Sequence, residues 1–221
     1  MRLELFYPHK PYFRLQAFGD SRVCAEDNGL PPTQRKLTGK VGAICPPGYV
    51  EFYPLLGMKG HTGEDLAAGR GVPIRASHDG KVREIQTEPE RGLGVGIVSH
   101  DRREMGSHGE HYAKTRYWHL LSINVTMDQE VKCGDLLGLA DNTGYSTGDH
   151  LHFELKPVEF NGDGSHYNVE QNNGYFGSID PHPFWNGVYA VDFAGLTTQL
   201  SEIAKVVLEL SKKIAQLIWR K

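Results

Sequence analysis

The stretch HLHFELK at residues 150–156 decides how the rest of the sequence is interpreted. Side chains alternate between the two faces of a β-strand, so His150 and His152 would share one face. Leu151 and Phe153 would enter the core from the opposite face. Two imidazoles on one face of a strand can reach a single small site. An HxH pair alone is a weak sign of metal binding, however, because surface or core histidines are more common.

Outward from this stretch, the region 41–158 is built from short apolar or alternating runs of strand length. The other runs are VGAICP, VPIRAS, GKVREIQ, VGIVSH, TRYWHLL and INVTM. Turn-forming Gly, Pro, Asp and Asn separate them, as in HDGK, ERGLGVG and DNTGYSTGD. No amphipathic helix pattern interrupts the region. The sequence therefore predicts a mainly β fold, with an antiparallel sheet assembly rather than a βαβ arrangement.

The chain divides into three parts by composition. Residues 1–40 mix aromatic, turn-forming and basic residues, and we expect an N-terminal extension that packs on the main domain or leads into it. Residues 41–188 form that main domain, and residues 189–221 follow it. Within the main domain, the polar stretches 101–114 and 159–180 are predicted to be long loops that wall a binding groove. Tolerated surface insertions are an equal alternative for either loop.

The last part of the chain carries a heptad pattern that predicts an amphipathic α-helix over residues 196–218. Its apolar face is wider than a coiled-coil seam, which suits a bundle or docking on another surface. Homo-oligomerisation through this helix is favoured over docking on the chain's own domain. Contact of its basic, aromatic end with a membrane surface is the least favoured alternative. The heptad positions are Leu196, Leu200, Ile203, Val207, Leu210, Ile214 and Leu217.

The bulk composition excludes several classes of partner and location. A net charge of -3 gives no bulk attraction to nucleic acid or to an anionic membrane. No stretch approaches the roughly 20 apolar residues of a membrane span. The N-terminal residues also lack the apolar run of a signal peptide. We therefore expect either action in the cytoplasm or exit by a route that this sequence does not encode.

The three cysteines, Cys24, Cys45 and Cys133, form no CxxC pair and no zinc-finger spacing. An odd number in a chain of this length does not indicate a disulfide framework. Cys24 and Cys45 could pair, but small buried or free thiols are the favoured interpretation. The redox compartment is left undecided.

Two further segments carry metal-binding or catalytic residue types. The segment HTGED places His61 and Asp65 four residues apart, in glycine-rich surroundings that argue against a helix. Imidazole and carboxylate are both suitable zinc ligands. The segment TRYWHLL places His119 among aromatic and aliphatic residues, where a packing role is the commoner one. Each segment alone is a weak signal.

Together, these segments resemble the lysostaphin-type (LytM-like) zinc metallo-endopeptidases. The order is HxxxD, then a histidine in an aromatic–aliphatic strand, then the turn DNTGYSTGD directly before HLHFEL. Lesser marks in the same order are GVPIRASHDGKV and VKCGDLLGLADNTG. The resemblance runs from about residue 42 to residue 183. It implies an enzyme that cuts peptide cross-links in bacterial cell walls.

The resemblance implies a role for each motif residue. His61, Asp65 and His152 would hold one Zn²⁺ per chain. His119 and His150 would be the catalytic pair beside the metal, with the choice of general base left open. The sequence departs from many relatives at Asp149, where they have proline. Tyr145, in the turn before HLH, is a further candidate for substrate binding, with a turn-packing role equally favoured.

These observations predict a zinc-dependent endopeptidase of peptidoglycan that acts in the bacterial cell envelope. The apparent lack of an export segment, together with the helical appendage, suggests a phage-type lysin (endolysin) or a virion-associated enzyme. A host envelope enzyme whose export segment is not in this sequence is the main rival. A non-catalytic wall-binding or assembly module is the alternative from another class, although intact His119 and His150 argue against it. A zinc peptidase of non-wall peptides is a third interpretation. Which bond is cut is left open.

Overall fold

The computed structural model describes residues 1–40, 44–190 and 193–218 of the chain. Residues 41–43 of the expected strand VGAICP and the basic end of the chain, residues 219–221, lie outside the described residues. The chain divides into two compact units, Met1–Ala190 and Val191–Lys221. The first unit carries the sheets and all of the candidate site residues. The second unit contains one long helix.

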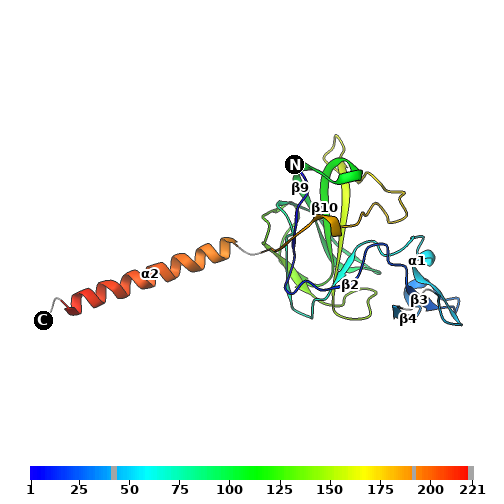
Figure 1. The fold of residues 1–221 in the computed structure, drawn as a ribbon, viewed down its shortest axis with the longest axis horizontal. Helices are drawn as coiled ribbons and strands as arrows, with labels where there is room; N and C mark the ends of the chain where they lie inside the picture. Colours follow the sequence, from blue (N-terminus) through cyan, green and yellow to red (C-terminus); the bar gives the residue numbers. More distant parts are fainter. Residues whose placement is uncertain (41–43, 191–192, 219–221) are drawn as a thin grey trace. The chain divides into compact units, whose positions relative to one another are not determined.

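A ten-stranded antiparallel sheet forms the centre of the first unit, as the strand patterns predict (Figure 1). Its main path runs in the order β11-β8-β9-β10-β13-β6-β2, with β12, β7 and β14 attached beside it. The mainly β, antiparallel fold class is therefore confirmed. The strands are β2 Arg14–Gln16, β6 Glu64–Leu66, β7 Pro73–Arg75, β8 Gly80–Glu88, β9 Gly92–Glu104, β10 Glu110–Ile123, β11 Glu130–Val131, β12 Leu136–Ala140, β13 Leu151–Phe160 and β14 His166–Asn168.

Strand β13 lies inside the sheet and is covered on both faces over residues 151–158. Leu151, Phe153 and Leu155 are fully buried in the main hydrophobic core. The opposite face carries polar side chains that are equally buried, beginning with His152 and Glu154. Because buried polar groups need partners, this face of β13 must be a satisfied polar network. It is the face on which the functional site is built.

The prediction of a long loop at residues 101–114 was wrong. Strand β9 extends to Glu104, a 3-10 turn covers Gly106–His108, and β10 begins at Glu110, so the stretch is a hairpin. Its polarity comes from charged pairs across the strands, since Arg102 and His111 both contact Glu159 of β13. Ion-paired strands and solvated loops have similar composition, which explains the misreading.

The N-terminal residues are built into the first unit. Strand β1 Leu5–Tyr7 pairs with β15 Trp185–Tyr189, which follows the 3-10 turn His182–Phe184, and β2 extends the central sheet. A separate three-stranded sheet contains β3 Val23–Glu26, β4 Leu37–Lys40 and β5 Tyr49–Glu51. It carries the 3-10 turn Pro32–Gln34 and leads into the short helix α1 Phe52–Leu55. We call β3, β4, β5 and α1 the small subdomain (Figure 1).

The small subdomain contains a disulfide bond between Cys24 and Cys45. The favoured prediction of free thiols was therefore wrong for these two residues, whereas Cys133 is a free, half-buried cysteine. The Cα atoms of Cys24 and Cys45 lie 5.8 Å apart, within the range that a disulfide can bridge. The bond joins β3 to the segment that precedes β5, so it closes the small subdomain.

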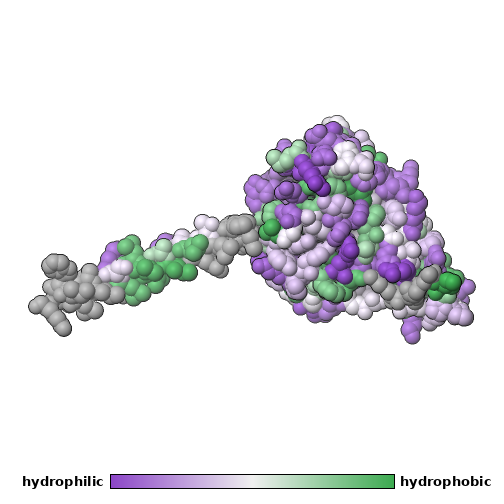
Figure 2. Space-filling model, in the orientation of Figure 1, coloured by the Kyte–Doolittle hydropathy of each residue, from purple (hydrophilic) through white to green (hydrophobic). Residues whose placement is uncertain are grey.

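The second unit consists of helix α2 Phe193–Ile218. Among its described side chains, Leu200, Ile203, Val207 and Leu210 are each more than half exposed, and Figure 2 shows the hydrophobic residues gathered along the helix. In the described part of the chain, no helix is long and apolar enough to cross a membrane. The amphipathic helix is present as predicted, and its homo-oligomerisation stays a prediction.

A buried histidine gives the fold a predicted sensitivity to acid. His78 donates from Nδ1 to the carbonyl oxygen of Asp79 at 2.8 Å, and its Nε2 lies 2.9 Å from Oγ1 of Thr115. Both ring nitrogens thus have a partner in the folded protein. Burial lowers the pKa of His78 to about 4. Protonation would add a buried charge and remove an acceptor.

We expect the free energy of unfolding to fall as the pH drops from about 6.5 to about 4 through His78. The folded pKa lies below the unfolded value, so this contribution is complete above the unfolded pKa and is lost on acidification. The loss is about 3 kcal/mol. Urea unfolding of wild type and His78→Gln at neutral and acid pH measures it. The variant should show the weaker pH dependence, and equal dependence would contradict the assignment.

Candidate metal centre

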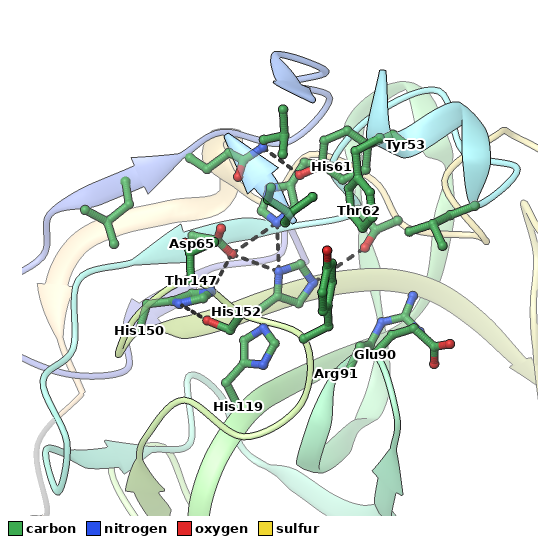
Figure 3. Close-up of a pocket in the computed structure, with 18 of the residues that line it drawn as sticks. Tyr53, His61, Thr62, Asp65, Glu90, Arg91, His119, Thr147, His150 and His152 are labelled. Carbon is green, nitrogen blue, oxygen red and sulfur yellow. Dashed lines mark hydrogen bonds and ion pairs between the residues drawn. The ribbon is translucent and has the colours of Figure 1, made fainter. Parts of the chain in front are cut away.

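Three side chains converge at the end of the polar face of β13. Strands β6 and β13 are antiparallel neighbours in which His152 lies opposite Asp65, and His61 precedes β6 by a short turn. The Nε2 atom of His61 lies 2.8 Å from Nδ1 of His152. Asp65 Oδ1 lies 2.9 Å from that Nδ1 and 3.1 Å from Nε2 of His61. The predicted ligands are thus brought together (Figure 3).

The outer hydrogen bonds of the two imidazoles decide which nitrogens face inward. His61 Nδ1 lies 3.2 Å from the carbonyl oxygen of Ala17, and His152 Nε2 lies 3.4 Å from Oε1 of Glu154. Both partners can only accept, so these two nitrogens carry the protons. The inward nitrogens of the neutral rings then present lone pairs to each other and to the Asp65 carboxylate. Such an arrangement is repulsive without a cation between the three atoms.

The residues present therefore fit a metal ion. Two imidazoles and a carboxylate form a donor set that zinc accepts, and ligand atoms about 2 Å from a tetrahedral ion lie roughly 3.3 Å apart. The separations of 2.8–3.1 Å are close to that value. Burial alone would raise the pKa of Asp65, but the positive charges of His61 and His150 in their protonated forms outweigh it and hold that pKa well below its usual range. The carboxylate is therefore ionised and ready to bind.

Glu154 lies directly behind His152 and is fully buried. It accepts hydrogen bonds from Thr62 Oγ1 at 2.7 Å and from Arg116 Nη1 at 2.8 Å. Burial alone would raise the pKa of Glu154, but the cations of Lys156, Arg116 and Arg91 hold it well below its usual range. An ionised carboxylate therefore fixes the tautomer and orientation of His152, in the pattern of carboxylate–histidine pairs behind metal ions.

We expect Glu154→Gln to weaken metal binding by about 10–100-fold, because an amide accepts less strongly and can present its NH₂ group to His152. Zinc affinity, measured by competition with a chromogenic chelator, checks this. Glu159→Gln is the matched control, because Glu159 lies on the same strand and pairs with Arg102 and His111 instead. Equal affinities in the wild type and Glu154→Gln would contradict the role given to Glu154.

His119 is aimed at the site by an irregularity in strand β10. The pairing with β9 shifts register between Tyr117 and Leu120, which leaves one extra residue on β10, and His119 has a φ of 61°. A bulge of this kind redirects a side chain, and left-handed backbone at a non-glycine residue is strained. The Nδ1 atom donates to the carbonyl oxygen of Thr143 at 2.6 Å. Nε2 is therefore the unprotonated nitrogen.

His150 is the neighbour of His119, and the centres of the two imidazole rings lie 4.6 Å apart. Its Nδ1 donates to the carbonyl oxygen of Gly148 at 2.7 Å, and its Nε2 lies 3.4 Å from Oδ1 of Asp65. Burial opposes protonation, but Asp65 outweighs it and raises the pKa of His150. For His119, burial together with His150 and His152 lowers the pKa to about 3. The two rings therefore differ in proton affinity.

A pocket of about 590 Å³ opens over these five residues, within the size range of ligand sites. Tyr145 lines it, as expected for a substrate contact, but its hydroxyl donates to the carbonyl oxygen of Arg35 and its ring centre lies 5.5 Å from that of Phe52. Tyr145 thus packs against the small subdomain as well. Its substrate role stays a prediction.

Two features of the site were not predicted from the sequence. They are Glu154 and the side of the pocket that is lined by residues from the N-terminal part of the chain. Glu154 could have been found, because it follows His150 and His152 at the same two-residue spacing on one face of the strand. For the N-terminal side of the pocket, no sequence pattern indicated which residues would line it. Its residues, such as Val23 and Phe52, are ordinary apolar residues that only the chain's path brings to the site.

The fold and the ligand cluster together define a metallopeptidase-type centre in an antiparallel β domain. The chain belongs to Peptidase family M23, whose family model matches residues 59–169. Asp65, His152 and the other motif residues all fall inside this range. The small subdomain, in contrast, precedes it.

The curated relatives include peptidoglycan endopeptidases. The chain is 38% identical over 111 residues to the glycyl-glycine endopeptidase ALE-1 of Staphylococcus capitis, which covers 49% of this chain and 28% of that protein. It is 41% identical over 95 residues to the peptidoglycan DD-endopeptidase ShyA of Vibrio cholerae, which covers 43% of this chain and 20% of that protein. The matched part therefore spans less than a third of either relative.

Solved structures of similar proteins include the catalytic domain of lysostaphin from Staphylococcus simulans. That domain is 27% identical, with a TM-score of 0.44, and the match covers 57% of this chain and 79% of that one. A zinc-containing peptidase from Vibrio cholerae is 28% identical, with a TM-score of 0.45 and coverage of 70% and 36%.

Proposed function

We propose that this protein is a zinc-dependent endopeptidase that hydrolyses peptide bonds in the cross-links or stem peptides of bacterial peptidoglycan. One observation carries the proposal: Nε2 of His61, Oδ1 of Asp65 and Nδ1 of His152 lie within 3.1 Å of one another at a pocket that also holds His119 and His150. A purely structural zinc site has four protein ligands, whereas three leave a position open for chemistry. Membership of a metallopeptidase family agrees with this reading.

Zinc bound at this centre would supply Lewis acidity, which makes water acidic and polarises a carbonyl group. Imidazole and carboxylate ligands in a set of three are the usual choice for catalytic zinc. Glu154 would hold His152 in the ligating tautomer, and the carbonyl oxygen of Ala17 would do the same for His61. These protein groups fix the ligand geometry before the ion and the substrate arrive.

His119 and His150 would divide the proton transfer between them. The free Nε2 of His119 is suited to accept a proton from the attacking water, because Nδ1 is already committed to Thr143. His150, beside Asp65, is suited to donate to the oxygen on which negative charge develops. Paired groups whose surroundings separate their proton affinities are a common basis for acid–base roles.

The peptidoglycan substrate and the envelope location are supported by the relatives, which are named as glycyl-glycine and peptidoglycan endopeptidases. The disulfide between Cys24 and Cys45 agrees with an oxidising environment outside the cytoplasm. A phage-type lysin, delivered to the cell wall by other machinery, is the form of this enzyme that we propose from the sequence.

Digestion of purified peptidoglycan tests the proposal. Zinc-loaded protein should release new amino groups from sacculi, and chelation followed by zinc addition should remove and restore the activity. The competing function is a wall-binding module, which would sediment with sacculi and release no amines. Binding without release in the zinc-loaded protein would overturn the enzyme assignment and favour that module.

A further inference from the structure

We propose that the small subdomain and Tyr145 form an apolar subsite that binds an alkyl side chain of the peptide substrate next to the scissile bond. The inference rests on the proposed function and extends it to substrate preference. A peptide made only of glycine would not be the preferred substrate. Except for Tyr145, the residues to which it assigns specificity precede the matched family region, 59–169. Most of the subsite would therefore lie outside the part of the chain that the family model covers.

The small subdomain has its own apolar cluster. Val23, Ala25, Phe52 and Tyr53 are buried in it. Half-buried apolar side chains pack against this cluster, and several of them also line the pocket. These pocket-facing members are Leu37, Leu56, Met58 and Tyr145. These side chains contact the buried cluster on one side and the pocket on the other. We call them the apolar wall, and its pocket-facing surface can contact an alkyl group.

This wall begins at the metal centre. The ring of Tyr53 lies 6.0 Å from the ring of His61, and its hydroxyl accepts a hydrogen bond from Gln16 Nε2 at 2.7 Å. At the other side, Tyr145 belongs to the turn that leads into His150. A peptide whose carbonyl group lies over the ligands would therefore have its neighbouring residue against the wall.

The wall is held in place by several independent connections. The disulfide between Cys24 and Cys45 closes the small subdomain, and the hydroxyl of Tyr145 bonds to the backbone at Arg35. On the opposite side, the amide of Lys59 donates to the carbonyl oxygen of Gly174 at 2.9 Å. A preorganised surface loses less entropy on binding than a flexible one. The geometry of the wall is therefore suited to discriminate between side chains.

An apolar wall favours alkyl groups over glycine for a simple reason. Glycine offers the wall no apolar surface, whereas each buried methylene group improves binding by about fourfold. A polyglycine segment would leave the apolar wall facing water within a pocket of about 590 Å³. The wall would thus select a peptide with alanine or a larger alkyl residue at this place.

Two peptides of equal length test the subsite, one made only of glycine and one with alanine at each side of the scissile bond. The zinc-loaded wild type should show the higher kcat/KM on the alanine peptide. Leu37→Ala and Leu56→Ala should each lower kcat/KM for that peptide about tenfold more than for the glycine peptide. Leu55→Ala is the matched control, because Leu55 packs on the same cluster and is not among the residues lining the pocket.

A preference of the wild type for glycine would overturn the subsite, as would an equal effect of Leu55→Ala. Calorimetric binding of both peptides to His119→Ala, in which cleavage should be much slower than in the wild type, separates this inference from the proposed function. One possible result is that the alanine peptide binds preferentially, that Leu37→Ala removes this preference, and that the wild type shows no turnover. This result supports the subsite and overturns the proposed enzymatic activity. Turnover of both peptides without preference supports the enzyme and overturns the subsite.

Discussion

Alanine at position 152 is expected to remove the metal and the peptidase activity together. His152 contributes the only inward nitrogen from β13 and contacts both other ligands, with Nδ1 at 2.8 Å from His61 and 2.9 Å from Asp65. Without it, two protein ligands remain. Changes behind a ligand weaken binding by up to about 100-fold, so the loss of the ligand itself should exceed that factor. Zinc content after gel filtration and amine release from sacculi measure the two effects.

The control for this prediction is His100→Ala. His100 is an exposed histidine of β9 that pairs with Glu130 and is not among the residues lining the pocket of the candidate metal centre. It should retain zinc and activity, so a general effect of losing a histidine is excluded. Retention of zinc by His152→Ala would show that another group takes its place. Full zinc content with unchanged activity would refute the assignment of His152.

The convergence of His61, Asp65 and His152 was predictable from the sequence because each segment has a local signature. The alternation in HLHFEL places His150 and His152 on one face, and β13 does carry His152 there, opposite Asp65 of β6. Strand pairing then fixes the distance between His152 and Asp65. The antiparallel class was predictable for the same reason, since two-residue periodicity and turn residues are properties of short segments.

The small subdomain was not predictable, because contacts between distant segments build it. Cys24 and Cys45 are 21 residues apart and belong to no motif, so composition favoured free thiols. The pairing depends on the path of β3, β4 and β5. Likewise, the hydroxyl of Tyr145 reaches Arg35 across 110 residues. No local pattern in either segment indicates that they share one wall of the pocket.

The backbone at His119 was also beyond sequence reasoning. An aromatic–aliphatic strand predicts regular alternation, in which His119 would lie opposite Trp118 on the other face. The register shift against β9 and the φ of 61° interrupt that alternation at this residue. Because the amide of His119 bonds to Arg91 and its carbonyl oxygen to Asp141, the surrounding structure holds the strained conformation. Strain that neighbours maintain at one residue indicates function.

His119→Ala is expected to lower kcat by about 10²–10⁴-fold, the usual contribution of a general acid or base. Zinc content should remain near that of the wild type, because His119 is outside the ligand set and its Nδ1 bonds to Thr143. Since alanine would adopt the same strained φ, His119→Gly is the matched variant, because glycine accepts φ of 61° at little cost. Both variants should be equally inactive, with His119→Gly the more stable to urea.

This pair of variants separates the chemistry of the imidazole from the strain of the backbone. If activity depended only on the conformation of β10, His119→Gly would be expected to lose more than His119→Ala, because it relaxes the constraint. If the imidazole carries the proton, the two losses will be equal although the stabilities differ. High activity in either variant, with zinc bound, would transfer the role of base to His150, the other ring beside the ligands.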